Sequence, residues 1–328
     1  MRGLCFLALV GVGCSADIGV DETPSVEIVS PAPGASFTRD ALGQTGALVA
    51  SVPLELDIGG SIAKVVIKSG DRELGDAISG SFTAEIRSAG TSTITATAVD
   101  ANGMELATTS LDVTVAEPQV ADCHGWLDLY KLEYEVSASK PGIADPITVT
   151  TPINGVEYRY NGNTDNRTSL MGDCTLIKSL ADGASIMREH DISTLVDIGV
   201  YNYRCIDQSK SPPNCTMSQH AYAKAIDIAA FVTNAGDKYS VLTDWEIDPA
   251  STTCSAETTP GKDAFLHEVI CALKKANVWN IVLTPNYNAD HRNHFHVDLT
   301  KGSDTIKREL SASDGLVDYR VGDGLLVD

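Results

Sequence analysis

The chain has 328 residues, of which 43% are hydrophobic and 21% are charged; this composition excludes global disorder and suggests about two domains of about 150 residues. Its 24 lysines and arginines are outnumbered by 44 aspartates and glutamates. The net charge of −20 argues against nucleic acid as a main partner, because a polyanion would be repelled. Eight cysteines indicate either an oxidising compartment or a metal cluster.

The first residues have the layout of a short secretory signal, which we assign to residues 1–13. Arg2 gives a charged start, residues 4–10 are apolar, and small residues follow. The apolar run is too short to span a bilayer, which takes about 20 residues. Cys14 is a lipidation candidate because it follows a small residue as in a bacterial lipobox, although Gly11 stands where leucine is usual. An ordinary signal cleaved nearby is the alternative, so membrane contact is expected only through an N-terminal lipid.

Residues 14–24 are acidic and polar and are predicted to form a linker, whereas residues 25–116 have an all-β pattern. The strand candidates, bounded by turn-forming residues, are 26–29, 54–58, 63–67, 82–86, 93–99 and 110–115. Several short strands in a segment of this length predict an immunoglobulin-like sandwich. The segment contains neither cysteine nor histidine, so we expect a spacer rather than a catalytic or adhesive domain.

Glu117 and Pro118 mark the boundary to a second domain, predicted at residues 120–305 and followed by an acidic tail at 306–328. Helical periodicity of the apolar side chains is found at 174–189 and 263–277. The strand candidates are 194–200, 225–231, 280–284 and 295–299. This mixture predicts an α+β domain.

Six cysteines lie in the second domain and are disulfide candidates: Cys123, Cys174, Cys205, Cys215, Cys254 and Cys271. They contain no CxxC pair, so a cysteine-based zinc cluster is not indicated. An even number of cysteines in an exported domain predicts disulfides, and the sequence leaves their pairing open.

Four of the seven histidines fall in two short segments of the second domain. The first segment contains His220 and Asp227, and the second contains His291, His294 and His296. His294 and His296 alternate on a predicted strand, so their side chains face the same way. Imidazole and carboxylate groups are good zinc ligands, and a catalytic zinc usually takes three protein ligands and a water. Asp298 has the same alternation, but Asp227 fits the ligand position better.

The two segments resemble the Ser-x-His-x-x-Gly-x-Ala-x-Asp and His-x-His signature of zinc peptidases that act on D-alanyl peptides of peptidoglycan. The matching residues of the first part are Ser218, His220, Ala225 and Asp227, and Ala223 stands in the place of glycine. The second part, His-x-x-His-x-His from His291, is similar to that of the penicillin-insensitive murein endopeptidases. Residues 203–208 resemble the Tyr-Arg-Ser…Gln segment of D-Ala-D-Ala carboxypeptidases.

The region from Cys123 to Leu299 most resembles the bacterial extensin-like C-terminal family. Its cysteines, the Gly-Asp-Cys step that ends at Cys174, and the Ala-Ile-Asp-Ile and His-Phe-His motifs carry this resemblance. The resemblance implies a multidomain protein, in which an Ig-like sandwich precedes an α+β domain of the Hedgehog/DD-peptidase type.

The resemblance also implies roles for single residues. His220, Asp227 and His296 would ligate zinc, and a water with a pKa lowered towards ~7 would attack a peptide bond. Arg204 would bind the developing oxyanion or a substrate carboxylate. Ser218 would hold the substrate or His220. Structural alternatives are an ion pair of Asp227 with a basic core residue and a surface position for Arg204 beside a disulfide.

The general base is the point at which this chain departs from the carboxypeptidases. They have a base glutamate where this sequence has Asn293, which cannot take a proton. His294 would then orient the water or take its proton, assisted by His291. Asp290 is a third candidate base, His291 is alternatively a solvated loop residue, and the site could also bind zinc without turnover.

The sequence therefore predicts an exported bacterial protein, either a periplasmic or cell-surface lipoprotein or a secreted one. The predicted activity is zinc-dependent hydrolysis of D-amino-acid-containing peptide bonds in peptidoglycan. The alternative is a non-catalytic module on the same scaffold that binds peptidoglycan or another cell-wall polymer, and a weaker one is a hydrolase of another wall polymer. Asn293 and Ala223, which depart from the peptidase signature, are the residues that favour the alternative of a non-catalytic binding module.

Overall fold

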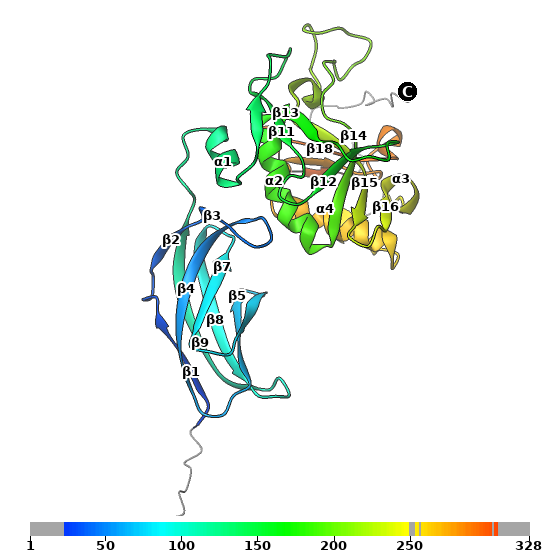
Figure 1. The fold of residues 1–328 in the computed structure, drawn as a ribbon. Helices are drawn as coiled ribbons and strands as arrows, with labels where there is room; N and C mark the ends of the chain where they lie inside the picture. The colour runs from blue at the N-terminus through cyan, green and yellow to red at the C-terminus, as the bar shows by residue number, and fades with distance from the viewer. Residues whose placement is uncertain (1–22, 249–252, 256, 304, 308–328) are drawn as a thin grey trace, which may run out of the picture. The chain divides into compact units, whose positions relative to one another are not determined.

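The computed structural model describes residues 23–248, 253–255, 257–303 and 305–307 (Figure 1). The predicted signal, Cys14, most of the predicted linker and nearly all of the acidic tail lie outside the described residues. The described residues divide into two compact units. One comprises the residues up to Phe37 together with Ser51–Val115, and the other comprises Thr38–Ala50 and the residues from Ala116 onward.

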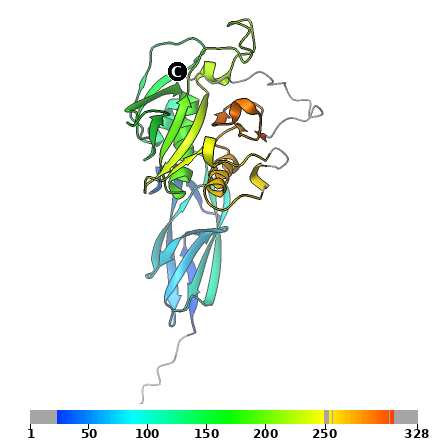
Figure 2. The ribbon, with the colours of Figure 1, turned by 90° about the vertical axis from the view of Figure 1, so that its right-hand side faces the viewer.

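The N-terminal part of the chain is built from strands, and every described helix follows it (Figure 2). The strands are β1 (Ser25–Ser30), β2 (Ser36–Thr38), β3 (Ala41–Leu42), β4 (Leu48–Gly59), β5 (Lys64–Ser69), β6 (Arg72–Ala77), β7 (Ser81–Ile86), β8 (Gly90–Val99) and β9 (Glu105–Ala116). They form one sheet of order β1-β4-β3, with β7 paired to β4, and another of order β2-β9-β8-β5-β6.

Alternation of apolar and polar residues explains these strands. In β4, Val52, Leu54 and Leu56 are buried, while the residues between them are exposed. β9 buries Leu111, Val113 and Val115 in the same way. Because successive strand side chains point to opposite faces, each strand contributes one apolar face to the core, and each fully buried aliphatic side chain stabilises the fold by about 1.5–3 kcal/mol.

The second unit mixes helices and strands, as expected for an α+β domain. Its helices are α1 (Cys123–Leu129), α2 (Cys174–Glu189), α3 (Val241–Asp244) and α4 (Lys262–Lys275), with short 3₁₀ turns η1 (Gln219–Tyr222), η2 (Thr253–Ser255) and η3 (Ala289–His291). Its strands are β10 (Tyr134–Val136), β11 (Pro146–Thr150), β12 (Glu157–Tyr160), β13 (Ser169–Asp173), β14 (Ile192–Gly199), β15 (Ala225–Thr233), β16 (Lys238–Ser240), β17 (Ile281–Leu283), β18 (Phe295–Asp298) and β19 (Thr305–Lys307).

The larger sheet of this unit has the order β12-β14-β15-β18-β17-β19, with β16 paired to β15, and a smaller sheet has the order β10-β11-β13. The apolar sides of α2 and α4 share one buried core with Ile226 and Ile228 of β15 and Phe295 and Val297 of β18. The intervening strand residues therefore face away from these helices.

The six predicted disulfide cysteines form three bonds, Cys123–Cys174, Cys205–Cys215 and Cys254–Cys271. These bonds are consistent with an extracellular or periplasmic protein, because disulfides persist in oxidising compartments. Among the described residues, no helix has both the length and the apolar character needed to cross a membrane.

Candidate metal centre

Two neighbouring antiparallel strands place a carboxylate and an imidazole side by side. Asp227 of β15 is directly opposite His296 of β18 in the ladder. Their apolar neighbours on both strands point into the helix-covered core, so both side chains project from the other face of the sheet. Asp227 Oδ1 lies 2.9 Å from Nδ1 of His296.

The third member of the group, His220, comes from the turn η1 that leads into β15. Ser218 caps this turn, since its hydroxyl accepts a hydrogen bond from the His220 N–H at 3.3 Å. The turn ends at Ala223, which has a left-handed backbone with φ of 51° and ψ of 36°. This conformation favours glycine, which explains physically why the resembling peptidases have glycine at this place, and alanine adopts it at a cost of about 1–2 kcal/mol.

The three ligand atoms form a compact triangle. His220 Nε2 lies 3.1 Å from Asp227 Oδ1 and 3.2 Å from His296 Nδ1, and the third edge is 2.9 Å. Bonds of 2.0–2.1 Å to a tetrahedral zinc separate two ligand atoms by about 3.3 Å. The triangle is therefore close to the size that one bound ion requires.

The outer hydrogen bonds of the two rings show which nitrogens carry protons. His220 Nδ1 lies 2.9 Å from the carbonyl oxygen of Val200, which can only accept, so this nitrogen donates. His296 Nε2 donates to Asp298 Oδ2 at 3.1 Å. In neutral rings, the lone pairs of His220 Nε2 and His296 Nδ1 then converge on the Asp227 carboxylate. Two lone pairs and an anion attract a cation, either a proton or a metal ion, and this N₂O donor set suits zinc.

The electrostatics of Asp227 agree with such a site. In the metal-free protein its burial favours the neutral acid, but the positive charges of protonated His220 and His294, with hydrogen bonds donated by protonated His220 and His296, outweigh burial and hold the pKa of Asp227 well below its usual range. The ligand nitrogens give up these protons when a metal ion binds. A ligand carboxylate must be ionised, so these neighbours keep Asp227 ready to bind a cation.

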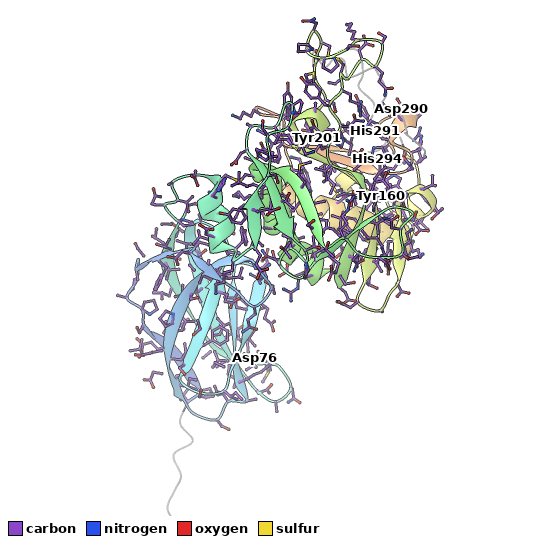
Figure 3. All side chains as sticks on the ribbon, turned by 45° about the horizontal axis from the view of Figure 1, so that its top comes forward. Asp76, Tyr160, Tyr201, Asp290, His291 and His294 are labelled. Carbon is purple, nitrogen blue, oxygen red and sulfur yellow. A yellow bond between two sulfur atoms is a disulfide. The ribbon has the colours of Figure 1, made fainter. Side chains whose placement is uncertain are left out.

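His294 and His291 border the triangle without joining it, and Figure 3 shows them next to each other. His294 Nε2 lies 3.5 Å from Asp227 Oδ1, and its Nδ1 lies 2.8 Å from the side-chain oxygen of Asn293. The ring of His291 is 5.1 Å from that of His294, and its Nδ1 lies 2.6 Å from Asn288 Oδ1. Both histidines are buried, and each has its Nδ1 beside an amide oxygen.

The predicted substrate residues lie on the segments that support His220. The Ser218 N–H donates to the Arg204 carbonyl at 3.1 Å, and the Asn202 N–H donates to the His220 carbonyl at 3.2 Å. The Cys205–Cys215 disulfide closes the loop between these segments. Arg204 is half-buried. Its role in substrate binding, like that of Ser218 beyond capping, stays a prediction.

The strand next to β15 carries a buried ion pair that no pattern in the sequence predicts. Arg167 contacts Asp197 of β14 with two nitrogens, at 2.7 and 3.1 Å, and the Asp197 side chain is fully buried. Burial raises the pKa of Asp197 to about 6, although Arg167 opposes the rise, and the negative charge of Asp227 adds to it. Two acidic groups of the sheet thus have pKa values displaced in opposite directions.

One other described group has the composition of a metal site, formed by His124, Asp145 and Cys174. Cys174 is bonded to Cys123, so its sulfur is not a thiolate ligand. His124 Nε2 instead pairs with the Asp145 carboxylate at 2.9 Å. This group is therefore a disulfide beside an ordinary histidine–aspartate contact.

The chain belongs to the family described as extensin-like protein C-terminus, whose model matches residues 130–307. No curated protein matches the sequence.

The N-terminal region is structurally similar to the fibronectin(III)-like modules of CbhA from Clostridium thermocellum. The match has 13% identity and a TM-score of 0.23, and it covers 29% of this chain and 99% of that chain. An engineered protein of known structure shares 25% identity over 28% of this chain and 20% of its own, with a TM-score of 0.20. The chain joins a β-rich N-terminal region to a mixed α+β region that carries the extensin-like domain.

Proposed function

We propose that the second unit is a zinc-dependent peptidase that hydrolyses D-amino-acid-containing peptide bonds of peptidoglycan. The observation that carries this proposal is the convergence of two imidazole lone pairs and one carboxylate within 2.9–3.2 Å. The zinc ion, when bound, would supply a water of lowered pKa and would polarise the scissile carbonyl. His220, Asp227 and His296 are the residues that would hold it.

His294 is the proposed general base. Its Nδ1 donates to the Asn293 oxygen, so its Nε2 is the basic nitrogen, and that nitrogen lies 3.5 Å from Asp227 Oδ1 at the edge of the triangle. A base must come within hydrogen-bond reach of the proton that it removes, and a water held at the triangle satisfies this condition for His294. The ring of His291 lies 5.1 Å from that of His294, and His291 would assist it.

Arg204 is proposed to bind the oxyanion or a carboxylate of the substrate. Its planar guanidinium suits paired oxygens, and its backbone is hydrogen-bonded to Ser218, the cap of the His220 turn. A positive group at this place also serves an acidic protein with a net charge of −20, because wall polymers are often anionic and need local attraction. We propose further that the protein is exported, with a lipid at Cys14, and that its N-terminal module is a spacer.

The test is digestion of purified muropeptides by the full-length protein, with and without a chelator, followed by mass spectrometry of the products. Cleavage that disappears with chelator, returns with added zinc and is lost in His220→Ala supports the proposal. No cleavage by a protein that holds stoichiometric zinc contradicts the peptidase and leaves the metal centre. A purified protein that binds no zinc contradicts both.

Asn293 favours a second candidate, a non-catalytic module that binds peptidoglycan or a related wall polymer. The residue stands where the resembling carboxypeptidases have their base, and its side chain has no titratable group. Sedimentation of the protein with intact peptidoglycan sacculi in the absence of cleavage would support this candidate.

A further inference from the structure

A buried carboxylate lies behind one of the three triangle residues. Asp298 follows His296 by two positions on β18, so both side chains point from the same face of the sheet. Asp298 Oδ2 accepts the hydrogen bond from His296 Nε2 at 3.1 Å, on the side of the ring opposite the triangle. Only 5% of Asp298 is exposed, so water competes little for this bond.

The strand neighbours and the backbone both fix this carboxylate. Its other oxygen, Oδ1, accepts from the Thr300 N–H at 2.8 Å. On the two flanking strands the register partners of Asp298 are Ala225 and Ile281, which are apolar and buried. Each oxygen therefore has one assigned donor, and an apolar setting strengthens a hydrogen bond that involves an ion.

His220 shows the same arrangement with a different partner. Its outer nitrogen donates to the Val200 carbonyl, a backbone group that belongs to the fold. His296 is oriented by a side chain instead, and its ring is turned the other way, so that Nδ1 rather than Nε2 faces Asp227. An imidazole whose proton moves from Nε2 to Nδ1 would present an N–H to the ion and could not bind it.

We propose that Asp298 is a positioning residue that holds the proton of His296 on Nε2 and thereby makes Nδ1 the metal-binding atom. This inference rests on the proposed zinc site and not on peptide hydrolysis. Partners of metal-bound histidines typically contribute 10–100-fold to metal affinity. Asp298 contributes in this way without touching the ion.

The first test measures zinc affinity of the full-length protein by competition with a chromophoric chelator. Asp298→Ala is expected to weaken zinc binding by about 10–100-fold. Asp298→Asn is expected to weaken it less, because an amide oxygen still accepts from Nε2. Asp263→Ala is the matched control, since Asp263 is also buried, accepts two backbone N–H groups and lies 3.6 Å from a histidine, His267, outside the triangle. It should lose thermal stability and keep its zinc affinity.

The second test needs no variant. Long-range ¹H–¹⁵N spectra of the zinc-loaded protein should show His296 with zinc on Nδ1 and a proton on Nε2. Zinc on Nε2 overturns the inference directly. It is also overturned if Asp298→Ala binds zinc as tightly as the native chain. This holds even if the melting temperature of the metal-free variant falls, because Asp298 would then have only a structural role. A native chain that binds no zinc overturns the metal centre together with this inference.

Discussion

The side-chain oxygen of Asn293 lies 2.8 Å from Nδ1 of His294. An amide oxygen accepts hydrogen bonds, so this contact holds the His294 proton on Nδ1 and leaves Nε2 as the basic nitrogen, on the side of Asp227. The asparagine stands where the carboxypeptidases that the motif resembles have their base. In this chain the contact would make Asn293 a support for the proposed base His294, so the substitution does not by itself remove acid–base chemistry from the proposed mechanism.

Replacement of His294 by alanine should separate catalysis from metal binding. We expect turnover to fall by about 10²–10⁴-fold, because a positioned base contributes that much, while zinc affinity stays close to that of the native chain. The measurement is muropeptide cleavage beside a zinc titration of the same preparation. Unchanged turnover would move the base to His291 or Asp290, and a loss of zinc would make His294 a ligand.

Replacement of Asn293 by leucine keeps the approximate size of the side chain but removes the acceptor for His294. We expect turnover to fall by about two- to tenfold, the equivalent of one hydrogen bond of 0.5–1.5 kcal/mol. The decrease should be in kcat rather than in KM, because the contact orients a base and not the substrate. A larger loss than in His294→Ala would show that Asn293 contacts the substrate itself.

Zinc should stabilise the second unit. Ligand at about 100 times its Kd adds about 2.7 kcal/mol to the free energy of unfolding, which raises Tm by about 5–10 °C for a domain of this size. Asp227→Asn removes the anion of the triangle and should abolish the shift, whereas Asp145→Asn, an exchange in a histidine–aspartate pair outside the triangle, should retain it. Calorimetry with chelator and with zinc measures both. An equal shift in the two variants would place the zinc elsewhere.

Asp197 should make the stability of the metal-free protein depend on pH. Its folded pKa of about 6 lies above the ordinary value of 3.8, so the folded state binds the proton more tightly. The stabilising contribution is present below pH 3.8 and is lost as the pH rises through about 6. The native chain should lose up to about 3 kcal/mol relative to Asp197→Asn between pH 4 and pH 7. Denaturant unfolding in chelator tests this, and the opposite trend would mean that Arg167 outweighs burial.

The disulfides should contribute differently to stability and to activity. Loop entropy gives about 4 kcal/mol for Cys123–Cys174, which spans 51 residues, and about 3 kcal/mol for Cys205–Cys215, which spans 10. Replacement of both Cys123 and Cys174 by serine should lower Tm more than the same replacement of Cys205 and Cys215. Replacement of both Cys205 and Cys215 by serine should lower turnover, because the loop that this bond closes joins Arg204 to Ser218. Equal turnover in the two variants would exclude a role of this loop in the site.

Elements with strong periodicity could be predicted from the sequence. The helix predicted at residues 174–189 coincides with α2, and the strand predicted at 225–231 lies within β15. In contrast, β6 was not predicted, because its Arg-Glu-Leu-Gly-Asp-Ala sequence lacks both alternation and β-branched residues.

Features that depend on distant contacts could not be predicted. The grouping of residues 38–50 with the second unit rests on contacts such as Asn154 Nδ2 with the Gly46 carbonyl, which no local pattern encodes. Within the site, the motif pointed to His220, Asp227 and His296, but one outer partner is the Val200 carbonyl, and a backbone group leaves no residue signature. The pairing of the cysteines likewise depends on which chain segments meet in three dimensions.

The ladder that sets Asp227 opposite His296 also has a kinetic consequence. The two residues are 69 positions apart, and a shift of the pairing by a single residue would turn one of them to the helix-covered face. A zinc ion held by the proposed triangle would therefore bind only after β15 and β18 have paired in the native register. The rate at which zinc binding appears during refolding would therefore report the rate at which this long-range strand pairing is completed. We expect it to be slower than the formation of the helices, whose contacts are local.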